Sequence, residues 1–194
     1  MKIIIEELDL VGVFAGCSNA EKSSAEDTPK ETTTEDTATE STGELKIGRV
    51  NSAPHGDKSF AVTVVAMDGD KIAVASIDEF QFLSTEEAGV IGVPNSDGAF
   101  AENFVDPKVV LASKVDSTEY YSAHMVEAAG STVAIHDNYA AIEEYVTGKT
   151  IAELEEELGK YTTDEDKAKM IDVVSGATLA DTHGYVTTFV EAAK

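Results

Sequence analysis

Two segments rich in β-branched residues flank a short polar turn in the first half of the chain. Residues 60–67 (FAVTVVAM) and 71–77 (KIAVASI) are joined by Asp68-Gly69-Asp70. An Asp-Gly pair between two such runs is a strong signal for a β-hairpin. Three other short segments fit strands less strongly: 44–50, 80–83 and 109–112. The segment 80–83 either continues the second strand of the hairpin or ends it. The pattern predicts an antiparallel sheet built on this hairpin.

The second half of the chain changes to the apolar spacing of amphipathic helices, which repeats every 3.6 residues. Helices are expected over residues 117–129, 138–147, 151–158, 164–170 and 179–193. Strands that come early and helices that come late are typical of the α+β class, whereas a parallel sheet needs alternating strands and helices. We therefore expect an α+β fold in which C-terminal helices pack on the antiparallel sheet.

A polar segment precedes this predicted domain. Residues 18–42 contain no apolar side chain larger than Ala, apart from the ring of Pro29, and consist mainly of Thr, Ser and Glu with a few Lys. Such a segment buries too little apolar surface to offset its loss of conformational entropy. We expect residues 18–43 to form a disordered acidic tether and residues 44–194 to form the folded domain.

The first 17 residues resemble the signal of a bacterial lipoprotein. Lys2 is followed by apolar residues and then by Phe14-Ala-Gly-Cys17, which is similar to the lipobox. This resemblance implies that Cys17 receives lipid and anchors the chain to the extracytoplasmic face of the cell membrane. Three acidic residues interrupt the apolar run, and the alternative is an N-terminal segment with an ordinary thiol.

Charge and cysteine content exclude several classes of function. The chain has 14 basic and 37 acidic side chains, which gives a net charge of −23. Residues 1–43 contain 10 of the acids and 3 of the lysines, so −7 of this charge lies there. Nucleic-acid binding and electrostatic binding to anionic lipid both need clustered Lys and Arg. A single Cys excludes an intrachain disulfide and a cysteine-ligated iron–sulfur cluster. The four histidines show no metal-ligand spacing, so no metal site is expected.

One short motif points to a specific chemistry. Residues 172–178 read Asp172-Val-Val-Ser175-Gly176-Ala177-Thr178, and this run resembles the signature of the FMN-binding domain family. That family includes the covalent-flavin domains of the sodium-pumping NADH:quinone reductase and of the related electron-transport complex, and flavin lipoproteins on the surface of Gram-positive bacteria. The resemblance implies that Thr178 carries covalent FMN through a phosphoester. It also implies that a flavin transferase recognises Asp172, Ser175, Gly176 and Ala177.

The resemblance extends beyond the motif in weaker form. The predicted hairpin and the helix after the motif both have counterparts in the family, and residues 117–154 are similar to single-domain surface members. What it implies is an electron-transfer flavoprotein rather than a stand-alone enzyme, with a quinone-linked or NADH-linked donor in the membrane and acceptors outside the cell. A component of a membrane redox pump is an alternative within the same class.

An alternative from another class is a surface lipoprotein without a cofactor that binds a ligand or partner. In that interpretation Thr178 is only the N-cap of the last helix, with Asp181 as its capping partner. The flavin interpretation also needs walls for the ring. Tyr120, Tyr121 and Met125 are candidates, although helical spacing also fits a plain core. His183 and Tyr185 are further candidates, but surface polar positions on a helix suit them better.

Overall fold

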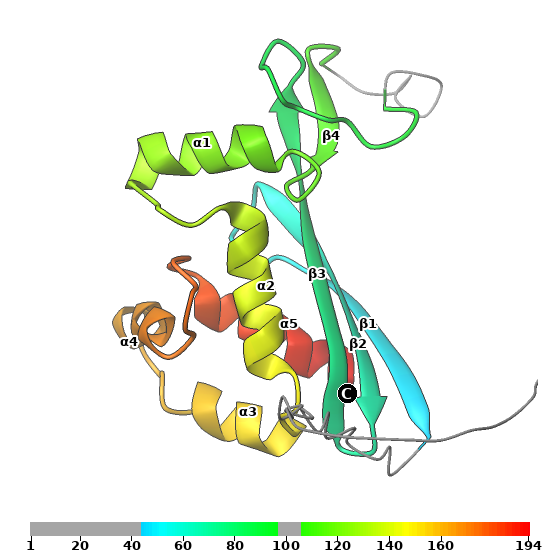
Figure 1. Ribbon diagram of the computed structural model, residues 1–194, viewed down its shortest axis with the longest axis vertical. Coiled ribbons are helices and arrows are strands. Elements are labelled where there is room, and N and C mark those ends of the chain that lie inside the picture. The colour runs from blue at the N-terminus through cyan, green and yellow to red at the C-terminus, as the bar shows by residue number, and fades with distance from the viewer. Residues whose placement is uncertain (1–43, 97–105) are drawn as a thin grey trace, which may run out of the picture. The chain divides into compact units, whose positions relative to one another are not determined.

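The strands form one antiparallel sheet whose spatial order follows the chain. The computed structural model describes residues 44–96 and 106–194. Strands β1 (Leu45–Ser52), β2 (Ser59–Asp68), β3 (Lys71–Ser84) and β4 (Val109–Ser113) lie side by side in the order β1-β2-β3-β4 (Figure 1). The predicted hairpin is confirmed, because Asp68 pairs with Lys71 across a two-residue turn. The second strand of the predicted hairpin, β3, continues through residues 80–83.

The helices follow the sheet in the chain, which confirms the α+β class. They are α1 (Thr118–Ala129), α2 (Ile135–Val146), α3 (Ile151–Leu158), α4 (Asp164–Ala168), the 3-10 turn η2 (Lys169–Asp172) and α5 (Thr182–Ala193). Three of the predicted helices differ from the structure. The helix expected over 138–147 begins at Ile135, the helix expected over 179–193 begins at Thr182, and the one expected over 164–170 is split between α4 and η2.

One face of the sheet carries the core. Helix α5 packs on β1 and β2, and α2 packs on β3, so that these helices lie on the same side of the sheet (Figure 1). Alternate residues of β2 point to this side and are buried: Ala61, Thr63, Val65 and Met67. This period of two is what a sheet with one covered face requires. On the other face, Ile47 and Val74 remain 80% and 61% exposed.

Helix α5 approaches the sheet closely at Gly48 of β1. A Cβ atom at this position would lie 1.7 Å from the carbonyl oxygen of Ala192, which no side chain can tolerate. The glycine therefore allows the end of α5 to rest directly on the backbone of β1. A second link joins the same layers at Thr63 and Thr188, whose buried hydroxyl oxygens are 2.8 Å apart.

A buried carboxylate lies at the centre of this packing. Glu79 of β3 is fully buried, and its Oε2 accepts hydrogen bonds from Lys114 Nζ at 2.5 Å and from the Tyr139 and Tyr185 hydroxyls at 2.9 Å each. Its Oε1 accepts a hydrogen bond from Ser59 Oγ at 2.7 Å. Burial favours the neutral carboxyl, but the charge and hydrogen bonds of its partners outweigh burial and hold the pKa of Glu79 below its usual value.

The predictions for residues 1–17 and 18–43, with lipid attachment at Cys17 among them, lie outside the described residues. Within 44–96 and 106–194, no helix has the length and apolar content that a membrane span requires.

Glu79→Gln should strongly destabilise the domain. The amide removes the charge that compensates buried Lys114, and an uncompensated buried charge costs about 3–5 kcal/mol of unfolding free energy. Urea unfolding at pH 7 measures this cost, and Glu87→Gln, at an exposed position, is the matched control. Because the folded-state pKa of Glu79 is lowered, its charge stabilises the fold above the usual carboxyl pKa and loses that effect as pH falls through the folded value.

The difference in unfolding free energy between wild type and Glu79→Gln should therefore shrink as the pH is lowered below about 4.3, the usual Glu range. Taking the difference at each pH cancels the contributions of Asp78 and Glu143, whose pKa values burial raises. A difference that stays constant from pH 7 down to pH 3 would contradict this account of Glu79.

Candidate functional site

The seven-residue motif begins at the last residue of η2 and continues into the connection to α5. Asp172 is the last residue of η2, and α5 begins at Thr182. Val174 and Ala177 are buried in the core cluster, whereas Asp172, Ser175 and Thr178 are exposed. The two apolar side chains therefore anchor the loop, and the polar residues that the resemblance assigns to the transferase and to the flavin face solvent.

Gly176 gives this loop its path across α2. Its φ is +90°, a backbone conformation that residues with a Cβ rarely adopt. A Cβ atom here would also lie 3.3 Å from the Cβ of Ala141 on α2. Gly176 thus combines a positive φ with a close approach to a helix, which explains why this position of the motif is a glycine.

Thr178 is held by one residue of α2, Asn138. The Thr178 N–H donates to Asn138 Oδ1 at 2.6 Å, and the Thr178 hydroxyl donates to the same oxygen at 3.1 Å. Asn138 is fully buried, and its Nδ2 donates to the carbonyl oxygens of Val133 and Ala134 at 3.1 and 3.0 Å. The amide of Asn138 thus joins the motif to the connection between α1 and α2.

The connection between α1 and α2 also contributes a hydroxyl. Ser131 Oγ lies 3.1 Å from Thr178 Oγ1, and Ser131 Oγ also donates to the Val133 carbonyl oxygen at 3.1 Å. Gly130 ends α1 in the left-handed conformation, after which the Ser131 N–H donates to the Met125 carbonyl oxygen. This helix end positions Ser131 beside the motif.

The structure contradicts the interpretation of Thr178 as a helix cap. The N-cap of α5 is Asp181, and both the N–H and the hydroxyl of Thr182 donate to the Leu179 carbonyl oxygen. The Thr178 hydroxyl is directed to Asn138 and Ser131 instead. Residues 179–181 separate Thr178 from the start of α5.

The candidate walls for a flavin ring divide into core and surface residues. Tyr121 is buried with its ring 4.6 Å from Lys114 Nζ, and Tyr185 is buried on Glu79, so its expected surface position is wrong. Tyr120 and Met125 of α1 are half-buried. His183 is half-buried, and burial lowers the pKa of its imidazole.

Two exposed apolar side chains belong to the segments that meet at Thr178. Val126 lies near the end of α1, just before the connection to Ser131, and is 57% exposed, while Val173 of the motif is 40% exposed. Apolar surface of this kind is what the flat face of a bound ring would cover.

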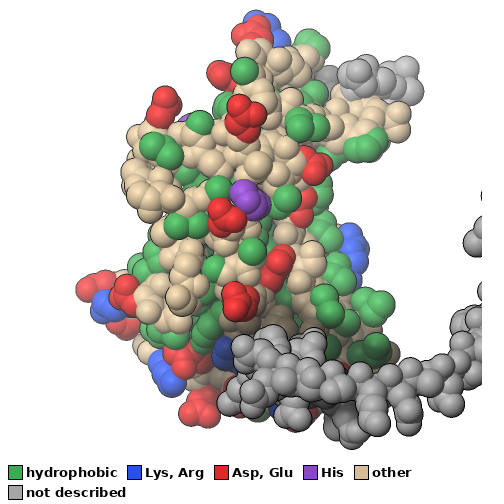
Figure 2. Space-filling model, in the orientation of Figure 1, with side chains coloured by type: hydrophobic (Ala, Val, Ile, Leu, Met, Phe, Trp, Pro, Cys, Tyr) green, Lys and Arg blue, Asp and Glu red, His purple; other side chains and the backbone are tan. Residues whose placement is uncertain are grey.

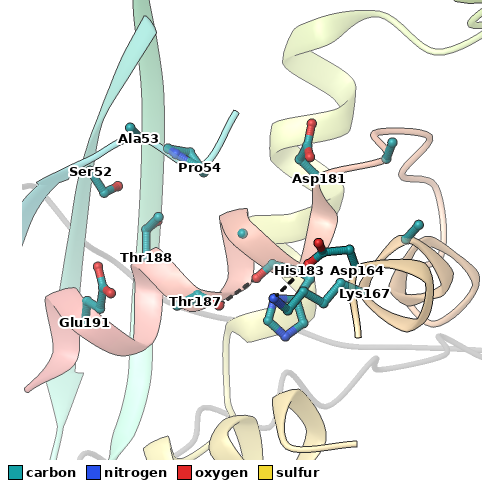
Figure 3. Close-up of a pocket in the computed structure, with 13 residues that line it drawn as sticks. Ser52, Ala53, Pro54, Asp164, Lys167, Asp181, His183, Thr187, Thr188 and Glu191 are labelled. Carbon is teal, nitrogen blue, oxygen red and sulfur yellow. Dashed lines mark hydrogen bonds and ion pairs between the residues drawn. The ribbon is translucent and has the colours of Figure 1, made fainter. Parts of the chain in front are cut away.

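A cavity of about 540 Å³ lies beside α5, between the end of β1 and α4 (Figure 3). This volume is within the range of small-molecule sites. Ala180 and Asp181, which follow the motif, line it together with Ser52, His183 and Lys167. The Asp181 carboxylate lies 2.7 Å from His55 Nδ1. Thr178 is not among the lining residues, so the cavity and the motif hydroxyl are separate features.

Acidic side chains are distributed over the face of the domain shown in Figure 2, with few Lys or Arg side chains among them. Across residues 44–96 and 106–194, no three His, Cys, Asp or Glu side chains are grouped closely enough to hold a metal ion.

Sequence reasoning missed Asn138 and Ser131 as parts of the site. Asn138 lies 40 residues before Thr178 and Ser131 lies 47 before it. Neither belongs to a motif. The sequence contains no signal for Asn138, because the predicted helix began at this residue and Asn is common at a helix start. Only the structure places it inside α2, which begins at Ile135.

A scan of family models and searches of curated proteins and of solved structures found no match to this chain. The likeness of residues 172–178 to the FMN-binding domain family therefore rests on the motif itself and stays a prediction.

Gly176→Ala should destabilise the domain more than Gly148→Ala. Both glycines have a positive φ, +90° and +81°, but only Gly176 has a neighbour within 4 Å of an added Cβ. The strained φ costs about 1–3 kcal/mol at each site, and the contact with Ala141 adds to this only at Gly176. Urea unfolding of the two variants measures the difference. Equal losses would show that the loop shifts away from α2 without cost.

Proposed function

We propose that this chain is a lipid-anchored, extracytoplasmic flavoprotein that carries FMN covalently on Thr178 and passes electrons between membrane donors and extracellular acceptors. The observation that supports it best is the exposure pattern of the motif. Asp172, Ser175 and Thr178 face solvent on a loop whose Val174 and Ala177 are buried. A modifying enzyme needs this arrangement, because it must reach both the hydroxyl and the residues that it recognises.

The residues around Thr178 suit a flavin phosphate. Thr178 is an exposed residue of the motif loop, and the Ser131 hydroxyl lies 3.1 Å from its own. Val126 and Val173 are exposed apolar side chains of the two segments that this contact joins. When bound, the flavin supplies the transfer of one or two electrons. The polypeptide positions the group and prevents its loss, which matters outside the cell, where a dissociated flavin diffuses away.

The attachment is a phosphoryl transfer. The Thr178 Oγ1 forms a bond to the phosphorus of an activated flavin nucleotide, and the bond from that phosphorus to the nucleotide leaving group breaks. The hydroxyl proton leaves to a base of the transferase. The chain gains the mass of one FMN less one water.

The membrane anchor of the proposal depends on Cys17, which lies outside the described residues. In the proposed arrangement, residues 18–43 separate the flavin domain from the lipid. The donor is then a quinone-linked or NADH-linked membrane protein. A component of a membrane redox pump uses the same covalent flavin, and co-purification of further pump components from membranes separates that alternative from a free shuttle.

Thr178→Ala should yield a folded domain without covalent flavin, because it removes the oxygen that forms the phosphoester. The measurement is intact-mass spectrometry of denatured full-length chain after co-expression with an active flavin transferase. Thr132→Ala, at an exposed threonine of the α1–α2 connection, is the matched control and should gain the full flavin mass. Flavin that stays on Thr178→Ala after denaturation would overturn the assignment.

Asp172→Ala should abolish flavin attachment while changing the unfolding free energy by no more than about 0.5 kcal/mol, as is usual for exposed positions. Asp172 is exposed, so a loss of labelling points to recognition by the transferase. Asp57→Ala makes the same change of charge at an exposed position of the β1–β2 connection. Normal labelling of Asp172→Ala would show that the transferase does not read this carboxylate.

A binding protein without a cofactor is the second candidate, and one observation favours it. Ile47, Ala66 and Val74 form a row across β1, β2 and β3 on the sheet face opposite the helices. Ile47 and Val74 are 80% and 61% exposed, and contiguous exposed apolar surface is a feature of contact surfaces. If wild-type chain stays colourless with a transferase that labels a control substrate, this candidate replaces the flavoprotein.

A further inference from the structure

Two hydroxyl protons serve three close contacts around Thr178. The contacts are Thr178 Oγ1 to Asn138 Oδ1, Ser131 Oγ to the Val133 carbonyl oxygen, and Ser131 Oγ to Thr178 Oγ1, each at 3.1 Å. Each hydroxyl carries one proton, and neither the amide oxygen nor the carbonyl oxygen has one to give. One of the three contacts is therefore always without a proton, so the two hydroxyls have more than one arrangement available.

Asn138 keeps its place whichever arrangement the hydroxyls adopt. Its Nδ2 is fixed by two backbone carbonyls, and its Oδ1 accepts the Thr178 N–H at 2.6 Å independently of the side chain. Because the Thr178 N–H and hydroxyl meet the same oxygen, the side-chain torsion of Thr178 is held relative to its backbone. The amide oxygen is too weak a base to remove the proton, so Asn138 positions the hydroxyl and does not activate it.

We infer that Asn138 and Ser131, both outside the seven-residue motif, form a cradle that presents the Thr178 hydroxyl for flavin transfer and remains hydrogen-bonded once the phosphoester exists. This inference rests on the proposed function. Asn138 acts before the transfer, by orienting the hydroxyl so that a lone pair of Oγ1 faces the solvent side. Ser131 acts during and after it, as a donor of a hydrogen bond to the esterified oxygen or to the flavin phosphate.

The hydrogen-bond count explains why the cradle accepts the modification. When the new bond from oxygen to phosphorus forms, Thr178 Oγ1 gives up its proton and becomes an acceptor only. Its contact with Asn138 Oδ1 then joins two acceptors and is lost, but Asn138 Oδ1 keeps the Thr178 N–H. The Ser131 hydroxyl, already 3.1 Å away, can turn its proton from Val133 to Thr178. Asn138 therefore keeps a partner for each of its buried polar atoms.

The test is the initial rate of flavin transfer to purified full-length chain, with active transferase and a flavin dinucleotide as the donor. Ser131→Ala and Asn138→Ala should each lower kcat about tenfold, the effect of losing one well-placed hydrogen bond in the reacting geometry. The KM for the protein substrate should not change, because the exposed motif residues are intact. Ser131→Thr retains the hydroxyl and should restore the rate.

Two matched controls separate positioning from stability. Thr132→Ala removes the hydroxyl next to Ser131, at an exposed position, and should be labelled at the wild-type rate. Thr188→Val removes a buried hydroxyl that contacts Thr63 and the Tyr185 carbonyl oxygen, so it weakens the fold away from the motif. It should leave kcat unchanged at a temperature where thermal melts show that all variants are folded. If Asn138→Ala fails to fold, the comparison of Ser131→Ala with Thr132→Ala decides by itself.

The outcomes distinguish this inference from the proposed function. Wild-type chain that gains no flavin mass, beside a control substrate that does, overturns both. Wild-type chain that is labelled while Ser131→Ala and Asn138→Ala keep the wild-type kcat overturns the cradle alone. A loss of kcat in Thr188→Val as large as that in the cradle variants also overturns it, because the effect then follows stability.

Discussion

The buried carboxylate of Glu79 is the interaction on which the arrangement of this domain depends. Its partners come from four places in the chain: Ser59 of β2, Lys114 after β4, Tyr139 of α2 and Tyr185 of α5. A charge without water is tolerated only when an opposite charge and further donors surround it. Strands β2 and β3, the end of β4 and helices α2 and α5 must therefore meet at Glu79 in one arrangement, because any shift leaves a buried charge without a partner.

Helix α2 carries this constraint to the surface. Tyr139 directs its hydroxyl to Glu79, its neighbour Asn138 holds Thr178, and Ala141 lies where a Cβ added at Gly176 would come within 3.3 Å of it. Three positions within one turn of the same helix thus bind the core on one side and the motif loop on the other. The loop is exposed, but its contacts with helix α2 fix its geometry. Precise sites are usually supported by rigid elements in this way.

In the proposed flavoprotein, the interior stabilises the fold and the motif loop at the surface is accessible for modification and electron transfer. The interior has a satisfied polar centre and closely packed helices, and Gly48 lets α5 rest on β1 without a gap. The motif lies at the boundary, with Val174 and Ala177 inside and Asp172 and Thr178 outside. A modifying enzyme and later an electron-transfer partner both need access to the same loop. Because buried side chains fix its backbone, the loop is accessible and still holds one conformation.

The sequence alone determined those features whose cause is local. The hairpin followed from β-branched runs around an Asp-Gly turn, and α3 followed from the helical apolar spacing of residues 151–158, so both were predicted closely. The motif with Thr178 was also visible, since its residues are consecutive.

Only the tertiary structure decided which polar residues belong together. Glu79 and Lys114 are 35 residues apart and Asn138 and Thr178 are 40 apart, and no periodicity connects them. The start of α5 was missed for a related reason, because the Thr178 hydroxyl is engaged by α2 and cannot cap the helix that follows it. Such pairings depend on which surfaces meet when sheet and helices pack, and that information is not present in any single stretch of the chain.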